Sequence, residues 1–264
     1  MATAPPILRP RTVLHVRGSW SARDDRIPSA VWLGIFLAGT VAGFGVDIPG
    51  FMRLKPPAPT IVDIHAFIFT AWLFILSAQV LFVLGDRIAW HKRMGLLAAF
   101  WVGLMAILGP WAALSFQAAD LHTSFGDPGF LSVQLGGIIA FVALIAWGFA
   151  LRRNPAAHRR MMMLATASIA GPGFARLNGH LLHLSHLLCL PPHSVLSAFV
   201  SLFYGDMLLV ILMTAWDCWR GRLMRSFVIG AAALVAVEVL MSASLYWNPW
   251  NEFALSLVRA WAKL

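Results

Sequence analysis

The histidines are the residues of this sequence that are best suited to chemistry. His180, His183 and His186 are spaced three apart, and on a helix this spacing places side chains on neighbouring turns of one face. Neutral imidazole is the commonest side-chain ligand of transition metals and a frequent ligand of haem iron. The run therefore predicts a metal or haem site, which a ligand from another helix would complete.

His65 is the residue that we expect to supply this ligand, because it lies near the start of a long apolar segment and in the same layer of the membrane as His180. A haem b held by two imidazoles needs histidines at equal depth on facing helices, and His65 with His180 or His183 meets that requirement. A copper or zinc ion would take two or three ligands from a wider set. That set comprises His65, His122, His180, His183 and His186. The alternative is that these histidines bind no cofactor and are only interfacial.

A second group with possible chemistry consists of charged residues inside apolar segments, namely Arg176, Asp206 and Glu238. A charge at the centre of a bilayer costs about 2.5–3.5 kcal/mol even on the most lenient insertion scale. We expect Arg176 to pair with Asp206 or Glu238, because pairing offsets much of this cost. Such a pair would either hold helices together or line a path for protons or a small solute.

The composition indicates that lipid is the solvent in which these residues are positioned. Hydrophobic residues make up 59% of the 264 residues and charged residues 12%, whereas soluble domains carry about 25% charge. The mean hydropathy is +0.76. A spanning helix needs about 20 mainly apolar residues. Segments of this kind lie near 28–47, 60–84, 94–116, 129–151, 160–181, 194–215 and 224–246, and Gly171-Pro172-Gly173 interrupts the fifth.

The basic residues alternate between the loops in a way that predicts an orientation. Lysine and arginine gather in the N-terminal tail and in loops 85–93, 152–160 and 216–225, whereas loops 117–128 and 182–193 are poor in them. Loop 48–59, with Arg53 and Lys55, is the exception. Basic loops face the cytoplasm, so the N-terminus is predicted inside and the C-terminus outside. Because the net charge of +9 is distributed in this way, we expect a lipid partner and no nucleic acid.

The sequence thus predicts an all-α, polytopic transmembrane bundle of about seven helices. Residues 1–27 form a basic cytoplasmic tail, residues 28–248 the transmembrane domain, and residues 249–264 an outer tail. Phe253 and Leu257 recur at helical spacing in this tail, which favours an interfacial position. The orientation places six histidines at the outer boundary, namely His65, His122, His180, His183, His186 and His193.

A short motif occurs twice at the inner boundary. His91-Lys92-Arg93-Met94 opens the third segment, and His158-Arg159-Arg160-Met161 opens the fifth. Two interpretations stay open, namely duplication of a helical hairpin and chance similarity between two basic loops.

These motifs resemble an uncharacterised family of bacterial multi-pass predicted inner-membrane proteins. The resemblance covers roughly residues 60–180. Its parts are His65 with Trp72 and Gln79, His91 to Gly95, and Asn154-Pro155 through His158 to Pro172 and Arg176. It implies a location in the bacterial inner membrane and no particular activity.

Two looser resemblances concern cofactors. The interface histidines and the basic turn before a glycine are similar to b-type membrane cytochromes of the cytochrome b561 and ferric-reductase kind, which implies haem b. Those proteins bind two haems, whereas here His91 and His158 lie beside basic residues at helix starts, so we expect a single outer site. The second of these looser resemblances is to small membrane proteins that assist the assembly of haem-copper oxidases.

The leading hypothesis from the sequence is an inner-membrane protein that binds haem b, copper or zinc near its outer face. Its role would be redox chemistry or metalloenzyme assembly, with His65, His180 and His183 as the first ligands. One alternative is a non-catalytic accessory subunit of a membrane protein complex, without a cofactor. The other is a small-solute transporter whose path is lined by Arg176, Asp206 and Glu238.

Overall fold

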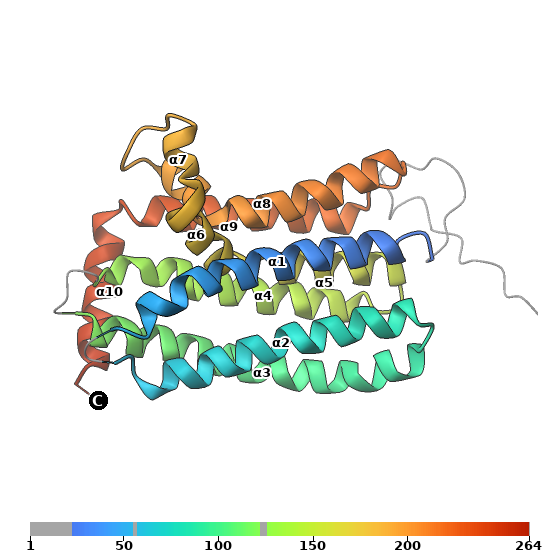
Figure 1. The fold of residues 1–264 in the computed structure, drawn as a ribbon, viewed down its shortest axis with the longest axis horizontal. Coiled ribbons are helices and arrows are strands. Elements are labelled where there is room, and N and C mark those ends of the chain that lie inside the picture. Colours follow the sequence, from blue (N-terminus) through green and yellow to red (C-terminus); the bar gives the residue numbers. More distant parts are fainter. Residues whose placement is uncertain (1–22, 55–56, 122–125, 264) are drawn as a thin grey trace, which may run out of the picture.

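The computed structural model describes residues 23–54, 57–121 and 126–263, and the regular elements in these ranges are helical. They are packed side by side in a bundle (Figure 1). In chain order they are α1 (Arg26–Phe51), α2 (Thr60–Leu84), α3 (Ile88–Ala119), η1 (Pro128–Phe130), α4 (Leu131–Ala150), α5 (Pro155–Ala167), α6 (Gly171–Leu177), η2 (Asn178–Leu182), α7 (Leu184–Leu187), α8 (Val195–Trp219), α9 (Arg225–Ser244) and α10 (Asn248–Trp261).

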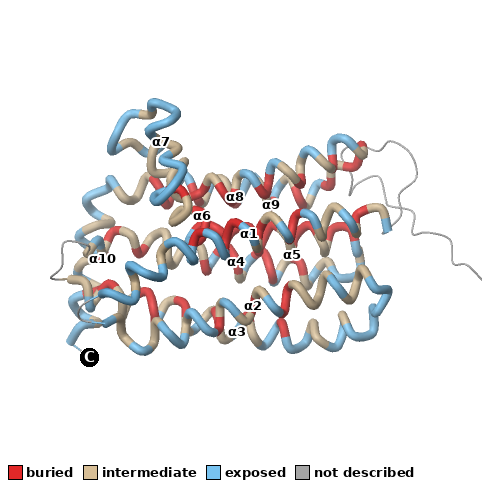
Figure 2. The backbone as a smooth tube through the Cα atoms, in the orientation of Figure 1, coloured by how far each residue is buried: buried red, intermediate tan, exposed pale blue. Residues whose placement is uncertain are grey.

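Six of these helices are long and apolar enough to cross a membrane, namely α1, α2, α3, α4 with η1, α8 and α9. Only 22% to 44% of the most apolar window of each helix is buried inside the protein. Figure 2 shows the buried residues on the inward faces of the helices and the exposed residues outside. Phe74 and Leu96 are 72% and 77% exposed. So large an apolar surface requires lipid rather than water, and the fold is that of a multi-pass membrane protein.

The two ends of the bundle differ in chemistry (Figure 1). The α2–α3, α4–α5 and α8–α9 connections share one end with the start of α1, and we call it the basic end because Arg87, Arg153 and Arg220 lie there. The other end carries residues 180–193 and α10, and we call it the histidine end. The predicted orientation, with the basic end in the cytoplasm, remains a prediction.

The predicted span 160–181 is divided between two short helices. Asn154 begins α5 by accepting a hydrogen bond on its side chain from the backbone N–H of Ala157 at 3.2 Å, which is a typical N-cap. Residues 168–170 then separate α5 from α6. Pro172 has no N–H to donate to the carbonyl four residues earlier, which favours a kink or break at this point. The expected interruption is confirmed, and the expectation of one long helix is wrong.

Helix α6 packs against α1 through glycine. A Cβ atom added to Gly43 would overlap the carbonyl oxygen of Gly173, so the two backbones touch directly. The ring of Phe174 fills the space beside Gly39 of α1 and Gly205 of α8, and a Cβ atom at either glycine would overlap it. Small residues allow close helix approach in this way in membranes. These contacts fix α6 between α1 and α8.

The basic end is joined by a buried network centred on Arg160 of α5. Its guanidinium donates two hydrogen bonds to the carboxylate of Asp217 on α8, of 2.6 and 2.5 Å. A third donor of the guanidinium reaches Asp25 at 3.4 Å. Asp25 also accepts a hydrogen bond from the indole N–H of Trp216 at 3.1 Å and pairs with Arg159 at 3.2 Å. Arg160, Asp25 and Asp217 are all buried. The network therefore joins α5 and α8 to the start of α1.

Helix α10 runs across the histidine end of the bundle (Figure 1). Ala254 and Val258 are buried against Ala113 of α3 and Leu131 of α4. The indole N–H of Trp250 donates to the carbonyl of Gly129 at 2.8 Å. With 14 residues, α10 is too short to span a membrane, and its interfacial position remains a prediction.

We expect Arg160→Met to destabilise the protein by about 3–5 kcal/mol, because two buried carboxylates lose their shared cation. Unfolding in mixed micelles would measure the change. Arg26→Ala is the control, since Arg26 binds the exposed Asp86 and holds the pKa of that carboxyl below its ordinary value. The control should have only a slight effect. A small effect of Arg160→Met would show that the network is not needed for the fold.

We also expect Gly43→Ala to destabilise the bundle by about 1–3 kcal/mol, the usual cost of overpacking. Gly34→Ala and Gly45→Ala on the same helix are matched controls, because no atom lies within 4 Å of a Cβ at either position. The same unfolding measurement should leave both controls as stable as the parent or more stable. Equal destabilisation by all three substitutions would contradict the crossing.

Candidate functional site

Two acidic side chains meet inside the bundle, Asp206 from α8 and Glu238 from α9. They are 0% and 1% exposed. Each is a hydrogen-bond and electrostatic neighbour of the other. No side-chain donor in the described parts of the chain reaches any of their four carboxyl oxygens. This pair is the largest uncompensated polar feature in the described core, and it is our candidate functional site.

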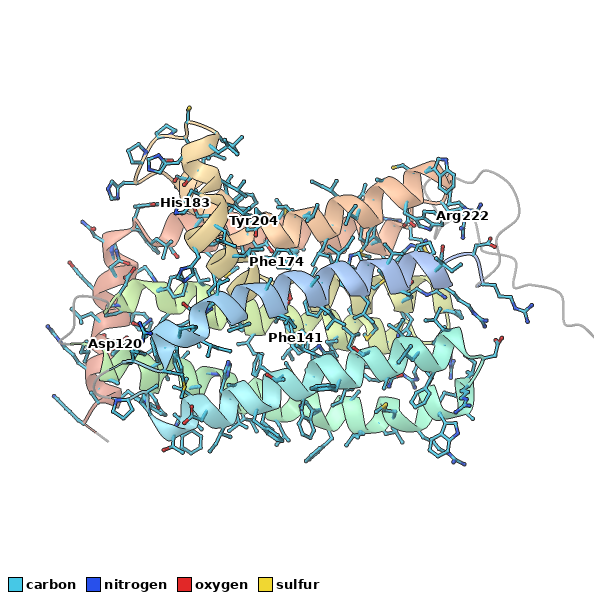
Figure 3. The ribbon with its side chains drawn as sticks, viewed as in Figure 1. Asp120, Phe141, Phe174, His183, Tyr204 and Arg222 are labelled. Atoms are coloured by element: carbon cyan, nitrogen blue, oxygen red, sulfur yellow. The ribbon has the colours of Figure 1, made fainter. Side chains whose placement is uncertain are left out.

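The pair adjoins the break between α5 and α6. A Cβ atom at Gly171, the first residue of α6, would lie 3.6 and 3.7 Å from the two carboxyl oxygens of Asp206. One turn later along the chain, the ring of Phe174 packs edge-on against Tyr204, with centroids 5.7 Å apart. Figure 3 shows these two rings where α6 passes α8. The hydroxyl oxygen of Tyr204 is buried without a hydrogen-bond partner among the described residues.

The arrangement dictates how the two carboxyl groups behave. Two ionised carboxylates within hydrogen-bond reach repel each other strongly where the dielectric constant is low. If one group is protonated, its O–H can donate to the other, and one proton then serves both groups. A pair of this kind binds and releases protons, and it can be titrated only if a path to water opens.

Arg176 lies elsewhere, so the expected ion pair with Asp206 or Glu238 is wrong. Its Nε donates to Asp47 of α1 at 2.6 Å, and an Nη donates to the carbonyl of Pro172 at 2.9 Å. The guanidinium also lies over the ring of Phe44, 4.7 Å from its centroid. The Arg176 side chain is 38% exposed. Asp47, near the end of α1, is therefore the acid that pairs with Arg176, in place of Asp206 or Glu238.

The predicted histidine run does not form one helical face. His183 has a left-handed backbone with φ of 48°, and it separates η2 from α7. The turn is fixed by the side-chain oxygen of Asn178, which accepts a hydrogen bond from the N–H of Leu184 at 2.8 Å. His180, His183 and His186 are all exposed. His180 reaches Asp47 at 3.2 Å, so its closest polar partner is an acid of α1.

The structure separates His65 from the histidines expected to join it. Helix α1 lies between α2, which carries His65, and the α6–η2 segment (Figure 1). The ring of His65 stacks on Phe69 with centroids 4.0 Å apart. His122 lies outside the described residues. Within the described ranges, no three His, Cys, Asp or Glu side chains are placed to share a metal ion.

His91 and His158, which we expected to be poor ligands, are brought together at the basic end. Their ring centroids are 6.2 Å apart. The repeated motif therefore has a structural counterpart, because the α2–α3 and α4–α5 hairpins each bring one of these histidines to the same place. A polar contact also joins α3 to α4, since the side-chain oxygen of Gln134 accepts a hydrogen bond from Gln117 at 3.3 Å.

Three acids that pair with arginines of α5 and α6 were not singled out from the sequence, namely Asp25, Asp47 and Asp217. The chain has only 11 acidic residues against 20 basic ones, so an acid next to a span is a natural partner for an arginine inside one. That signal was available. It does not say which arginine each acid meets, because sequence gives depth but not rotation about the helix axis.

Neither a protein-family model, nor a curated protein, nor a solved structure matches this chain. The resemblances drawn from the sequence motifs therefore remain predictions, and the function has to be argued from the site.

A double-mutant cycle tests the revised pairing. We expect Arg176→Ala with Glu238→Gln to be additive within about 0.5 kcal/mol, as for independent sites. Arg176→Ala with Asp47→Asn should show a coupling energy of at most about 1 kcal/mol, because the pair is partly exposed. Glu238→Gln alone should be close to neutral, since the amide can donate to Asp206 in place of the shared proton. Strong coupling of Arg176 to Glu238 in reversible unfolding would contradict this arrangement.

Proposed function

We propose that this chain is a membrane protein that binds protons at the Asp206–Glu238 pair and moves them, alone or with a small solute, across the membrane. The observation that carries the proposal is that two fully buried carboxyl groups face each other without a cation among the described residues. Ionisable residues inside a membrane are expensive and usually mark ion or substrate paths. A pair kept only for stability would be expected to have an arginine or lysine partner.

The broken span supports the proposal. Coupling-ion sites of many transporters lie beside discontinuous helices, whose backbone is tolerated at membrane depth only where it lines a site. Here the α5–α6 break adjoins Asp206 through Gly171. The two halves are held differently, α5 by the Arg160 network and α6 by glycine contacts with α1. The two halves are therefore free to respond separately when the charge of the pair changes.

The partly exposed Arg176–Asp47 contact offers a route to the pair from the histidine end. At the basic end, Asp25, Arg160 and Asp217 instead line a hollow of about 500 Å³ between α1, α5 and α8, where they are bound to one another. At the histidine end, Arg176 and Asp47 are partly exposed, 38% and 30%. Arg176 is also bound to the carbonyl of Pro172, the residue that follows Gly171 at the pair. A proton arriving from water would meet this Arg176–Asp47 pair first and the carboxyl pair next.

Proton flux into liposomes that contain the purified protein is the direct test. A pH-sensitive dye inside the vesicles reports the flux when a membrane potential is imposed. We expect Asp206→Asn and Glu238→Gln each to lower the flux about tenfold or more, because the relay then lacks one of its two groups. Glu252→Gln, at an exposed acid on α10, is the matched control and should leave the flux unchanged.

Infrared spectroscopy tests the shared proton without assuming a solute. At neutral pH the parent protein should show the carbonyl stretch of a buried protonated carboxylic acid, and the band should shift or disappear in Asp206→Asn and Glu238→Gln but not in Glu252→Gln. If the parent protein shows no such band and no flux above that of empty liposomes, the proposal is wrong. The accessory-subunit hypothesis would then be preferred.

A further inference from the structure

His91 and His158 form an imidazole pair at the basic end, contributed by two hairpins that share a motif. Their rings are nearly perpendicular, at 82°, with centroids 6.2 Å apart. A transition-metal ion lies about 2.0–2.1 Å from an imidazole nitrogen, so an ion between the two rings is compatible with this separation. Both side chains are half-buried, which shields the space between the hairpins from full hydration.

Both rings have a nitrogen that is available to a ligand. His158 uses Nδ1, which lies 2.8 Å from the carbonyl oxygen of Gly148 and leaves Nε2 as the acceptor. Metal-binding histidines are typically oriented in this way, with the second nitrogen donating to a carbonyl. The Nδ1 of His91 is buried without a hydrogen-bond partner among the described residues.

A polar side chain accompanies the pair. The amide nitrogen of Gln79 lies 3.9 Å from the Cβ position of Gly95, one turn after His91 on α3. The side-chain oxygen of Gln79 is buried and has no hydrogen-bond donor among the described residues. Because Gly95 lies one turn after His91, the Gln79 side chain lies beside the turn of α3 that carries this histidine. The neighbouring cations do not occupy the same space, since Lys92 is exposed and Arg159 pairs with Asp25 at 3.2 Å.

We propose that His91 and His158 bind one transition-metal ion of the class that prefers imidazole nitrogen, such as copper or zinc, with Gln79 as the accompanying oxygen donor. The ion would join the α2–α3 hairpin to the α4–α5 hairpin at the basic end. This assignment is independent of the Asp206–Glu238 pair, and it lies at the opposite end of the bundle from the site expected for His180, His183 and His186.

The test uses the full chain, purified in detergent, stripped with a chelator and incubated separately with Zn²⁺ and with Cu⁺ under a reductant. We expect about one equivalent of one of these ions per chain after desalting, measured by elemental mass spectrometry. His91→Ala and His158→Ala should each weaken binding about tenfold or more in competition with a chromogenic chelator. His186→Ala and His193→Ala, at exposed histidines of the other end, are the matched controls and should bind as the parent does.

Several outcomes would overturn the assignment. They are metal below about a tenth of an equivalent, full retention by His91→Ala, and loss in His186→Ala. A haem spectrum that disappears in His158→Ala would also overturn it, because the histidine pair would then bind haem rather than a single metal ion. If either alanine variant fails to fold, X-ray absorption of the loaded parent protein decides. Imidazole scattering from two ligands supports the proposal, and scattering without imidazole refutes it.

Discussion

A guanidinium inside an apolar bundle is tolerable only where carboxylates surround it, and Arg160 is placed accordingly. It binds Asp217 of α8 at two points and Asp25 at the start of α1. This interaction fixes one half of the broken span at the basic end. With α5 held there, the break at residues 168–170 falls at the level of the carboxyl pair. The position of α6, and with it the Arg176–Asp47 contact, then follows.

Two clusters of buried charged side chains among the described residues differ in whether a cation accompanies the acids. At the basic end, every acid of the network has an arginine within reach, which is the arrangement expected of a structural element. In the interior, Asp206 and Glu238 have only each other among the described residues. A carboxylate paired with an arginine is held ionised, whereas a carboxyl group without a cation can hold a proton. Our proposal for Asp206 and Glu238 rests on this contrast rather than on burial itself.

Sequence alone was sufficient for six of the seven predicted spans and insufficient for the contacts between them. Apolar length identified the six helices, and Pro172 identified the interruption, because both properties are local. The site was predicted in part. Asp206 and Glu238 were chosen correctly as buried charges, but Arg176 was assigned to them because all three share a depth. Which face of a helix turns inward depends on contacts such as Gly43 with Gly173, which join residues far apart in the chain.

The Arg160 network also constrains the order in which the chain can be assembled. Arg160 and Asp217 are 57 positions apart, so the arginine leaves the ribosome well before the acid that binds it at two points. Asp25 at the start of α1 precedes both residues in the chain and can bind Arg160 as soon as α5 is made. The two-point contact with Asp217 forms only once α8 has joined the bundle. The position of α5 is therefore completed by a segment that is synthesised after it.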